Sequence, residues 1–166
     1  MAPYQEVSLT AIEAAELLGR DLARAGQALG ASDLPTALDS YARALGLALQ
    51  LGPAPAEQVL AAVCEGAHAL VLGQDAASLS ALGPAVVGLV AQVRDEEALP
   101  RTRIMDAWAT IASDLGALIG QVGLVLALPI DHRPGMLANA RRRVELLDEA
   151  TGARFALVSW LEEIEG

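Results

Sequence analysis

Apolar side chains return every three or four positions along nearly the whole chain, and strict alternation of apolar and polar residues is almost absent. The clearest example follows Thr10, where the apolar positions are Ile12, Ala15, Leu18, Leu22, Ala25 and Leu29. Steps of three and four place these side chains on one face of a helix. Runs of β-branched and aromatic residues bounded by turns are missing, which argues against a sheet. The pattern predicts an all-α fold.

Seven helices are predicted, separated by short segments that hold most of the turn-forming residues. Their approximate ranges are 10–29, 34–51, 55–72, 78–94, 101–128, 134–149 and 155–164. Short connections require neighbouring helices to run antiparallel. No linker rich in Pro, Gly or Ser divides the chain. We therefore expect a single domain over residues 1–166, built as three helical hairpins and a terminal helix.

Several residues predict where these helices begin, end or bend. Ser8 and Thr10 are candidate N-caps of the first helix, and the segment from Thr10 to Glu13 fits a capping box. The pair Ser32-Asp33 is expected to cap the second helix, and Asp75 or Ser78 the fourth. Pro84 follows Gly83 inside the fourth helix, and an interior proline removes a backbone hydrogen bond. We expect a kink or a break there.

The first predicted hairpin resembles a tetratricopeptide repeat over residues 17–53. The second helix contains Ala37-Leu38-Asp39-Ser40-Tyr41-Ala42-Arg43-Ala44-Leu45, which matches that family's second-helix pattern, and Leu18-Gly19 and Gly26 fall in the first helix. The second hairpin lacks the aromatic residue, and the spacing between successive units is uneven. The resemblance implies an α-solenoid with a concave surface for a peptide or helix. An irregular helical bundle explains the same pattern.

Composition narrows the function classes. The formal net charge is −10, so binding to a phosphate backbone is disfavoured. The single cysteine cannot form an internal disulfide, and the first six residues do not resemble a signal peptide, so a cytoplasmic location is expected. Residues 76–93 and 115–130 carry no charge, in a chain that is 54% hydrophobic. We expect buried helices or a self-association surface there rather than membrane spans, because polar residues and glycines interrupt both stretches.

The best candidate for chemistry is Cys64-Glu65-Gly66-Ala67-His68. Cys64 and His68 are four residues apart and share a helix face, and Glu65 and His68 have the Glu-x-x-His spacing of di-iron bundles. A metal site needs further ligands from other helices, and His132 is the only other histidine. The alternative is a buried cysteine that acts as a small hydrophobe, with a histidine at the helix edge.

Acidic pairs one helical turn apart offer a second possibility. They are Glu13/Glu16, Glu145/Asp148 and Glu162/Glu165. Such pairs bind Mg²⁺ in all-α nucleotide pyrophosphohydrolases, where they lie on adjacent helices. Here the first two pairs lie at opposite ends of the chain, and solvated helix faces explain them equally well.

Arginines and tryptophans complete the candidate residues. Arg141, Arg142 and Arg143 are adjacent in sequence, with Arg133 and Arg154 nearby. Consecutive helical residues point about 100° apart, so no flat basic patch is expected. Pairing with Glu145, Asp148 or Glu149 is one explanation, and contact with an acidic partner is the other. Trp108 and Trp160 are expected to anchor the core.

These observations favour a non-enzymatic protein-interaction or scaffold module, which binds a peptide or helix in a groove between hairpins or associates with itself. A homodimer would bury the fifth helix and the C-terminal helix. Lysine is absent, and phosphate-binding and nucleophile motifs are missing, so no catalytic, cofactor-binding or metal residue is assigned. The alternatives are a metal-dependent nucleotide pyrophosphohydrolase-like enzyme, and a carrier of an apolar ligand held beside Gly116, Gly120 and Gly123.

Overall fold

The computed structural model describes the backbone of residues 3–165 and the side chains of residues 11–165. Seven α-helices, one short 3₁₀ helix and no strand form the described part, which confirms the all-α prediction. The α-helices are α1 (Pro3–Gly30), α2 (Leu34–Leu51), α3 (Pro53–Leu72), α4 (Ala76–Glu96), α5 (Arg103–Ala127), α6 (Pro134–Thr151) and α7 (Val158–Glu165). The 3₁₀ helix, η1, spans Ile130–His132, where a loop was expected.

The first helix is longer than the pattern predicted. It begins at Pro3, so Thr10 lies inside the helix and the predicted capping box is wrong. Proline is well accommodated in the first turn of a helix, where its missing amide would have no partner. The prediction that there is no signal peptide depends on the first six residues. Of these, Met1 and Ala2 lie outside the described residues.

Two similar turns join α1 to α2 and α3 to α4. Asp33 accepts a hydrogen bond from the Thr36 amide at 3.3 Å, and Asp75 accepts one from the Ser78 amide at 3.1 Å, so both predicted caps are confirmed. The residue before each cap has a positive φ, 57° at Ser32 and 53° at Gln74. The Ser32 hydroxyl donates to the Asp75 carboxylate at 3.3 Å and ties the two turns together. These bonds, chiefly those from Ser78, lower the pKa of Asp75.

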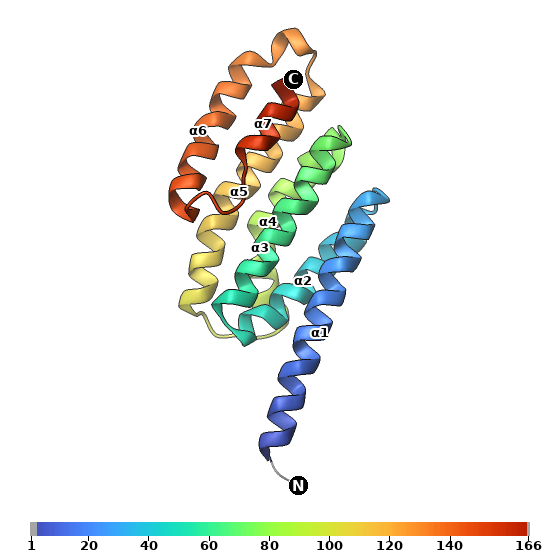
Figure 1. The fold of residues 1–166 in the computed structure, drawn as a ribbon, viewed down its shortest axis with the longest axis vertical. Coiled ribbons are helices and arrows are strands. Elements are labelled where there is room, and N and C mark those ends of the chain that lie inside the picture. Colours follow the sequence, from blue (N-terminus) through green and yellow to red (C-terminus); the bar gives the residue numbers. More distant parts are fainter. Residues whose placement is uncertain (1–2, 166) are drawn as a thin grey trace.

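The helices pack in a regular order. Helices α1, α3 and α5 contact one another in succession, α2 packs against both α3 and α4, and α6 packs against α5 (Figure 1). The short α7 turns back onto α3 and α6. One buried hydrophobic cluster includes residues from all seven helices, and Trp108 and Trp160 are its largest members, as expected. Figure 1 also shows that the N-terminal part of α1 extends well beyond the other helices.

The closest pair of helices is α4 and α5, and glycines make this approach possible. A Cβ atom added to Gly83 would lie 2.5 Å from the Gly116 carbonyl oxygen and 2.7 Å from the Gly120 nitrogen. A Cβ atom at Gly123 would lie 2.7 Å from the Ser80 nitrogen. The backbones of the two helices are therefore in direct contact, as in small-residue helix packing.

Helix α4 continues through Pro84, so the predicted break is not observed. Pro84 is exposed and lines a surface groove together with Gly116 and Gly120 of α5. The adjacent Gly83 packs directly on the α5 backbone. Tertiary contact beside the proline thus offsets the backbone hydrogen bond that it removes.

Helices α4 and α5 are long and apolar enough to cross a membrane by length and composition alone. Within their most apolar windows, 39% of the α4 residues and 44% of the α5 residues are buried inside the protein. The buried share includes the α4–α5 contact and, for α5, the contacts with α3 and α6. The uncharged stretches therefore supply much of the core, and the cellular location stays a prediction.

Candidate binding pocket between α3 and α5

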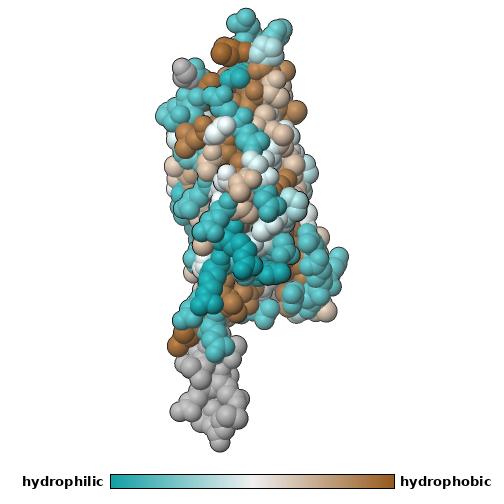
Figure 2. Space-filling view, turned by 90° about the vertical axis from the view of Figure 1, so that its right-hand side faces the viewer, coloured by the Kyte–Doolittle hydropathy of each residue, from teal (hydrophilic) through white to brown (hydrophobic). Residues whose placement is uncertain are grey.

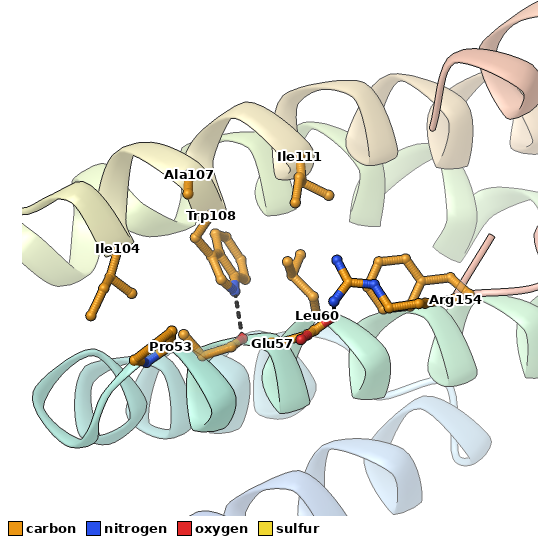
Figure 3. A pocket seen from close by; sticks show the side chains of 10 residues that line it. Pro53, Glu57, Leu60, Ile104, Ala107, Trp108, Ile111 and Arg154 are labelled. Carbon is orange, nitrogen blue, oxygen red and sulfur yellow. Dashed lines mark hydrogen bonds and ion pairs between the residues drawn. The ribbon is translucent and has the colours of Figure 1, made fainter. Parts of the chain in front are cut away.

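An apolar pocket lies between α3 and α5, beside the segment that connects α6 to α7. Its walls are formed by Leu60 from α3, by Ile104, Trp108 and Ile111 from α5, and by Phe155 from the connection. Figure 3 shows these α5 side chains pointing from one helix toward Pro53 and Leu60 on the other. The pocket has a cavity volume of about 140 Å³ and opens to solvent.

One hydrogen bond holds the tryptophan wall in place. The indole nitrogen of Trp108 donates to the Ala56 carbonyl oxygen at 2.9 Å, and Trp108 is only 2% exposed (Figure 3). Because a buried indole N–H needs a partner, this bond fixes the ring orientation. The pocket therefore has a rigid wall that joins α5 to the first turn of α3.

A single ion pair lies at the opening. Arg154, from the α6–α7 connection, pairs with Glu57 on α3, and the Arg154 Nε donates to the Thr151 carbonyl oxygen at 2.6 Å. The two side chains are 53% and 39% exposed, so solvent screens the pair and it adds little to stability. Its partners are free to exchange with charges on a bound molecule.

The lining of this pocket suits binding rather than chemistry. Glu57 and Arg154 are its only ionisable residues, and no cysteine, histidine or hydroxyl side chain lines it. The cavity volume of about 140 Å³ lies below the about 300–1,000 Å³ typical of drug-sized ligand pockets, so the space suits a single apolar side chain better than a whole ligand. The arrangement fits an apolar group that carries a nearby charge.

The structure separates the candidate residues of α3. Cys64 is buried beside Tyr41, Glu65 lines a groove between α3 and α1, and the His68 ring stacks on Trp160 of α7 with centroids 6.3 Å apart. The His68 Nε2 is buried without a hydrogen-bond partner among the described residues. The buried position of Cys64 fits the alternative in which this cysteine acts as a small hydrophobe.

We expect the Cys64 thiol to be unreactive in the folded protein. Burial, with a smaller contribution from Glu65, raises its pKa to about 12, so about one part in ten thousand is thiolate at pH 8. A chromogenic disulfide reagent at pH 8 should label it only after urea unfolds the chain. Rapid labelling without denaturant would contradict this burial, and labelling in urea serves as the control for reagent activity.

The acidic pairs do not converge. Glu13/Glu16 lie on α1, Glu145/Asp148 on α6 and Glu162/Glu165 on α7, and α1 does not pack closely against α6 or α7. Among the residues that the structure describes, no three His, Cys, Asp or Glu side chains form a group that could hold a metal ion. The metal-dependent alternative requires four converging carboxylates, an arrangement not found within residues 11–165.

The arginines of the C-terminal region find partners other than those expected. Arg141 pairs with Glu165 of α7, and the Arg143 Nε donates to Gln121 of α5 at 3.0 Å. Arg133 donates to the Leu128 carbonyl oxygen at 3.0 Å, near the C-terminal end of α5. The predicted pairing with acids of the same helix is wrong, because neighbouring helices offer closer acceptors.

The glycines of α5 do not leave room for a ligand in the way that was expected. The Cβ directions of Gly116 and Gly123 are filled by α4, and only Gly120 faces open space, in a shallow surface groove. Large apolar side chains of α5 and α7 are buried within one chain: Trp108, Leu115, Trp160 and Leu161 are each at most 2% exposed, whereas Leu124 of α5 is 53% exposed.

Sequence reasoning missed the pocket as a unit. The sequence predicts Trp108 as a core residue and Arg154 as part of a basic cluster, and it does not predict that the two side chains meet. Their meeting depends on the turn at Gly152, which has a left-handed φ of 65° and directs Arg154 and Phe155 toward α3. Gly152 after a helical run was the available signal. No family model, curated protein or solved structure matches this chain.

Proposed function

We propose that this protein is a non-enzymatic interaction module, in which the α3–α5 pocket receives an apolar anchor side chain of a peptide or helical partner. The observation that carries the proposal is the combination of a rigid apolar wall with a solvent-screened ion pair at the rim. Interaction energy concentrates where one large apolar side chain fills a preformed pocket. Arg154 would meet a partner carboxylate when Glu57 is displaced.

Selection of a displayed helical-peptide library tests this proposal. Ala107 is exposed and lines the pocket, so Ala107→Glu blocks the opening without removing a core side chain. Peptides selected on the original chain should bind Ala107→Glu at least about tenfold more weakly, a loss of about 1.4 kcal/mol. Calorimetry measures the affinities, and circular dichroism checks that each variant is folded.

Thr110→Glu is the matched control, because it adds the same charge to an exposed position of α5 outside this pocket. Peptides that bind the control and the original chain equally support the pocket as the site. The proposal fails if no peptide is enriched, or if Ala107→Glu and Thr110→Glu bind the selected peptides alike.

A carrier of a small apolar ligand is a second candidate, favoured by the apolar lining of the same pocket. Its expected position differs from the glycine face of α5, which α4 fills. Native mass spectrometry of protein purified from cells distinguishes the two: a carrier should retain a bound small molecule that Ala107→Glu loses. Protein that carries no such molecule removes this candidate and leaves the interaction module standing.

A further inference from the structure

The part of α1 that lies beyond the other helices has an uncovered apolar side. Among the α1 side chains that the structure describes, from residue 11 onward, the first buried one is Leu18, whereas Ile12 is 55% exposed and Ala15 is also exposed. Ile12 and Ala15 belong to the same helical repeat as Leu18, which packs into the core. The apolar face therefore continues past the point where the rest of the chain covers it. We call residues 11–17 the α1 arm.

A groove between α1 and α3 continues this uncovered side. Its α1 wall consists of Gly19, Leu22, Ala23 and Gly26, and its α3 wall consists of three alanines, Gln58, Glu65 and Gly66. The groove has a volume of about 430 Å³ and is open to solvent, and a Cβ atom placed on Gly19 or Gly26 would meet no other atom within 4 Å. From Ile12 through Ala15, Gly19 and Ala23, the spacing of three or four residues keeps arm and groove on one side of α1. The groove can receive the side chains along one face of a second helix.

Charges along α1 define the direction of a helix in this groove. Glu13 and Glu16 precede the groove, and Arg20 and Arg24 lie beside it. None of these four forms an ion pair among the described side chains, whose ion pairs involve other arginines. If a second α1 ran antiparallel to the first, its acidic residues would face the basic residues of the first helix. Its basic residues would face the acidic residues of the first helix. A parallel arrangement would face like charges with like.

We propose that two copies of this chain form a two-fold dimer in which each α1 arm lies antiparallel in the α1–α3 groove of the other copy. Ile12 fills the space beside Gly19 and Ala23 of the partner subunit, and Glu16 faces Arg20 of the partner subunit. A two-fold axis repeats both contacts, as expected for the commonest closed oligomer. Each copy carries a net charge of −10, so two copies repel each other in most orientations. Complementary charge at this surface would therefore direct the association.

This dimer does not depend on the function proposed for the α3–α5 pocket, which shares no lining residue with the groove. Figure 2 views the side on which α1 lies and shows hydrophilic residues along it, with a hydrophobic patch beside them at the lower end of the body. Such a pattern suits a surface that combines apolar contact with directing charges.

Sedimentation velocity over a concentration series tests the dimer. The original chain should show twice the mass of one chain, and Gly19→Leu should be monomeric at the same concentrations. Gly19 faces open space, so leucine fills the groove without a clash and a better helix former replaces glycine. Circular dichroism should show an unchanged or higher melting temperature for this variant. A monomeric original chain, or a dimer that Gly19→Leu leaves intact, overturns the proposal.

Charge exchange tests the antiparallel register. Glu16→Arg and Arg20→Glu should each weaken the dimer about tenfold, because each substitution converts two symmetry-related attractions into repulsions. The double variant restores opposite charges and should return the dissociation constant to within about threefold of the original. Leu124→Asp, which changes an exposed apolar residue of α5, is the control and should leave the dimer unchanged. Failure of the double variant to recover overturns the proposed register.

Discussion

Gly83→Ala is expected to lower the free energy of unfolding by about 3 kcal/mol, at the upper end of the usual cost of adding a methyl group to a filled core. The new methyl would lie 2.5 Å from the Gly116 carbonyl oxygen and 3.0 Å or less from two Gly120 backbone atoms. A side chain could rotate away, but these neighbours are backbone. Relief therefore requires α4 and α5 to separate, which loosens the largest helix contact in the fold. Urea denaturation followed by circular dichroism measures the change.

Gly88→Ala on the same helix provides the matched control. Gly88 is exposed and faces open space, so the substitution adds helix propensity alone and should stabilise by about 1 kcal/mol. Opposite signs at two glycines five residues apart would establish that α4 is held on α5 by backbone contact. If both variants raise the stability, α4 and α5 do not approach as closely as described.

Trp108→Ala is expected to cost about 4 kcal/mol, because it removes a nearly fully buried aromatic side chain from the core. Single domains are stable by about 5–15 kcal/mol, so much of the folding free energy would be lost. Trp108→Phe should cost about 2 kcal/mol, since it keeps most of the packing and loses the bond to the Ala56 carbonyl oxygen. Thermal and urea unfolding measure both differences.

The test compares the stability lost in Trp108→Ala with the smaller loss expected in Trp108→Phe. Leu146→Ala removes an apolar side chain that is 56% exposed and should change stability by no more than about 0.5 kcal/mol. A Trp108→Phe variant as stable as the original chain would show that the indole bond does not hold the pocket wall. Retained helix content in Trp108→Phe would then allow the peptide-binding measurements to be repeated on it.

The proposed dimer and the proposed pocket function would use two different sides of α3. One side of α3 faces the α1 groove through Glu65 and Ala69, and another faces α5 through Glu57 and Leu60. Self-association at the first groove would leave the second open in each copy. Two pockets in one dimer would raise the apparent affinity for a partner that presents two anchors, because the second contact becomes intramolecular.

Much of the helical structure follows from local pattern. The repeat of apolar residues every three or four positions predicted seven helices. Asp33 caps α2 and Asp75 caps α4, because each side chain can reach a free backbone amide. Large apolar residues in the middle of predicted stripes, such as Trp108 and Leu115, are buried as expected. Each of these features depends on residues within about one helical turn, so the sequence alone carries the information.

The local rules were wrong at Thr10, where the helix already begins at Pro3, and at Pro84 and Arg141, where distant residues compete. Thr10 could cap a helix, yet Pro3 begins one earlier, and Pro84 could break a helix, yet contact between Gly83 and α5 accompanies an unbroken one. Arg141 has acids nearby on its own helix, but the Glu165 carboxylate of α7 is the partner. Propensity terms of about 1–3 kcal/mol are smaller than the packing energy of a whole helix face.

The sequence by itself determined that this chain is helical, where most helices begin and end, and which large side chains lie inside. Only the tertiary structure decided which helices touch, because side chains on different helices meet through contacts between residues far apart in sequence. It brought Trp108, Glu57 and Arg154 to one pocket, used the glycines of α5 for contact with α4, and left the α1 arm uncovered. Helical periodicity specifies a face, whereas the partner of that face depends on the shape and charge of the whole molecule.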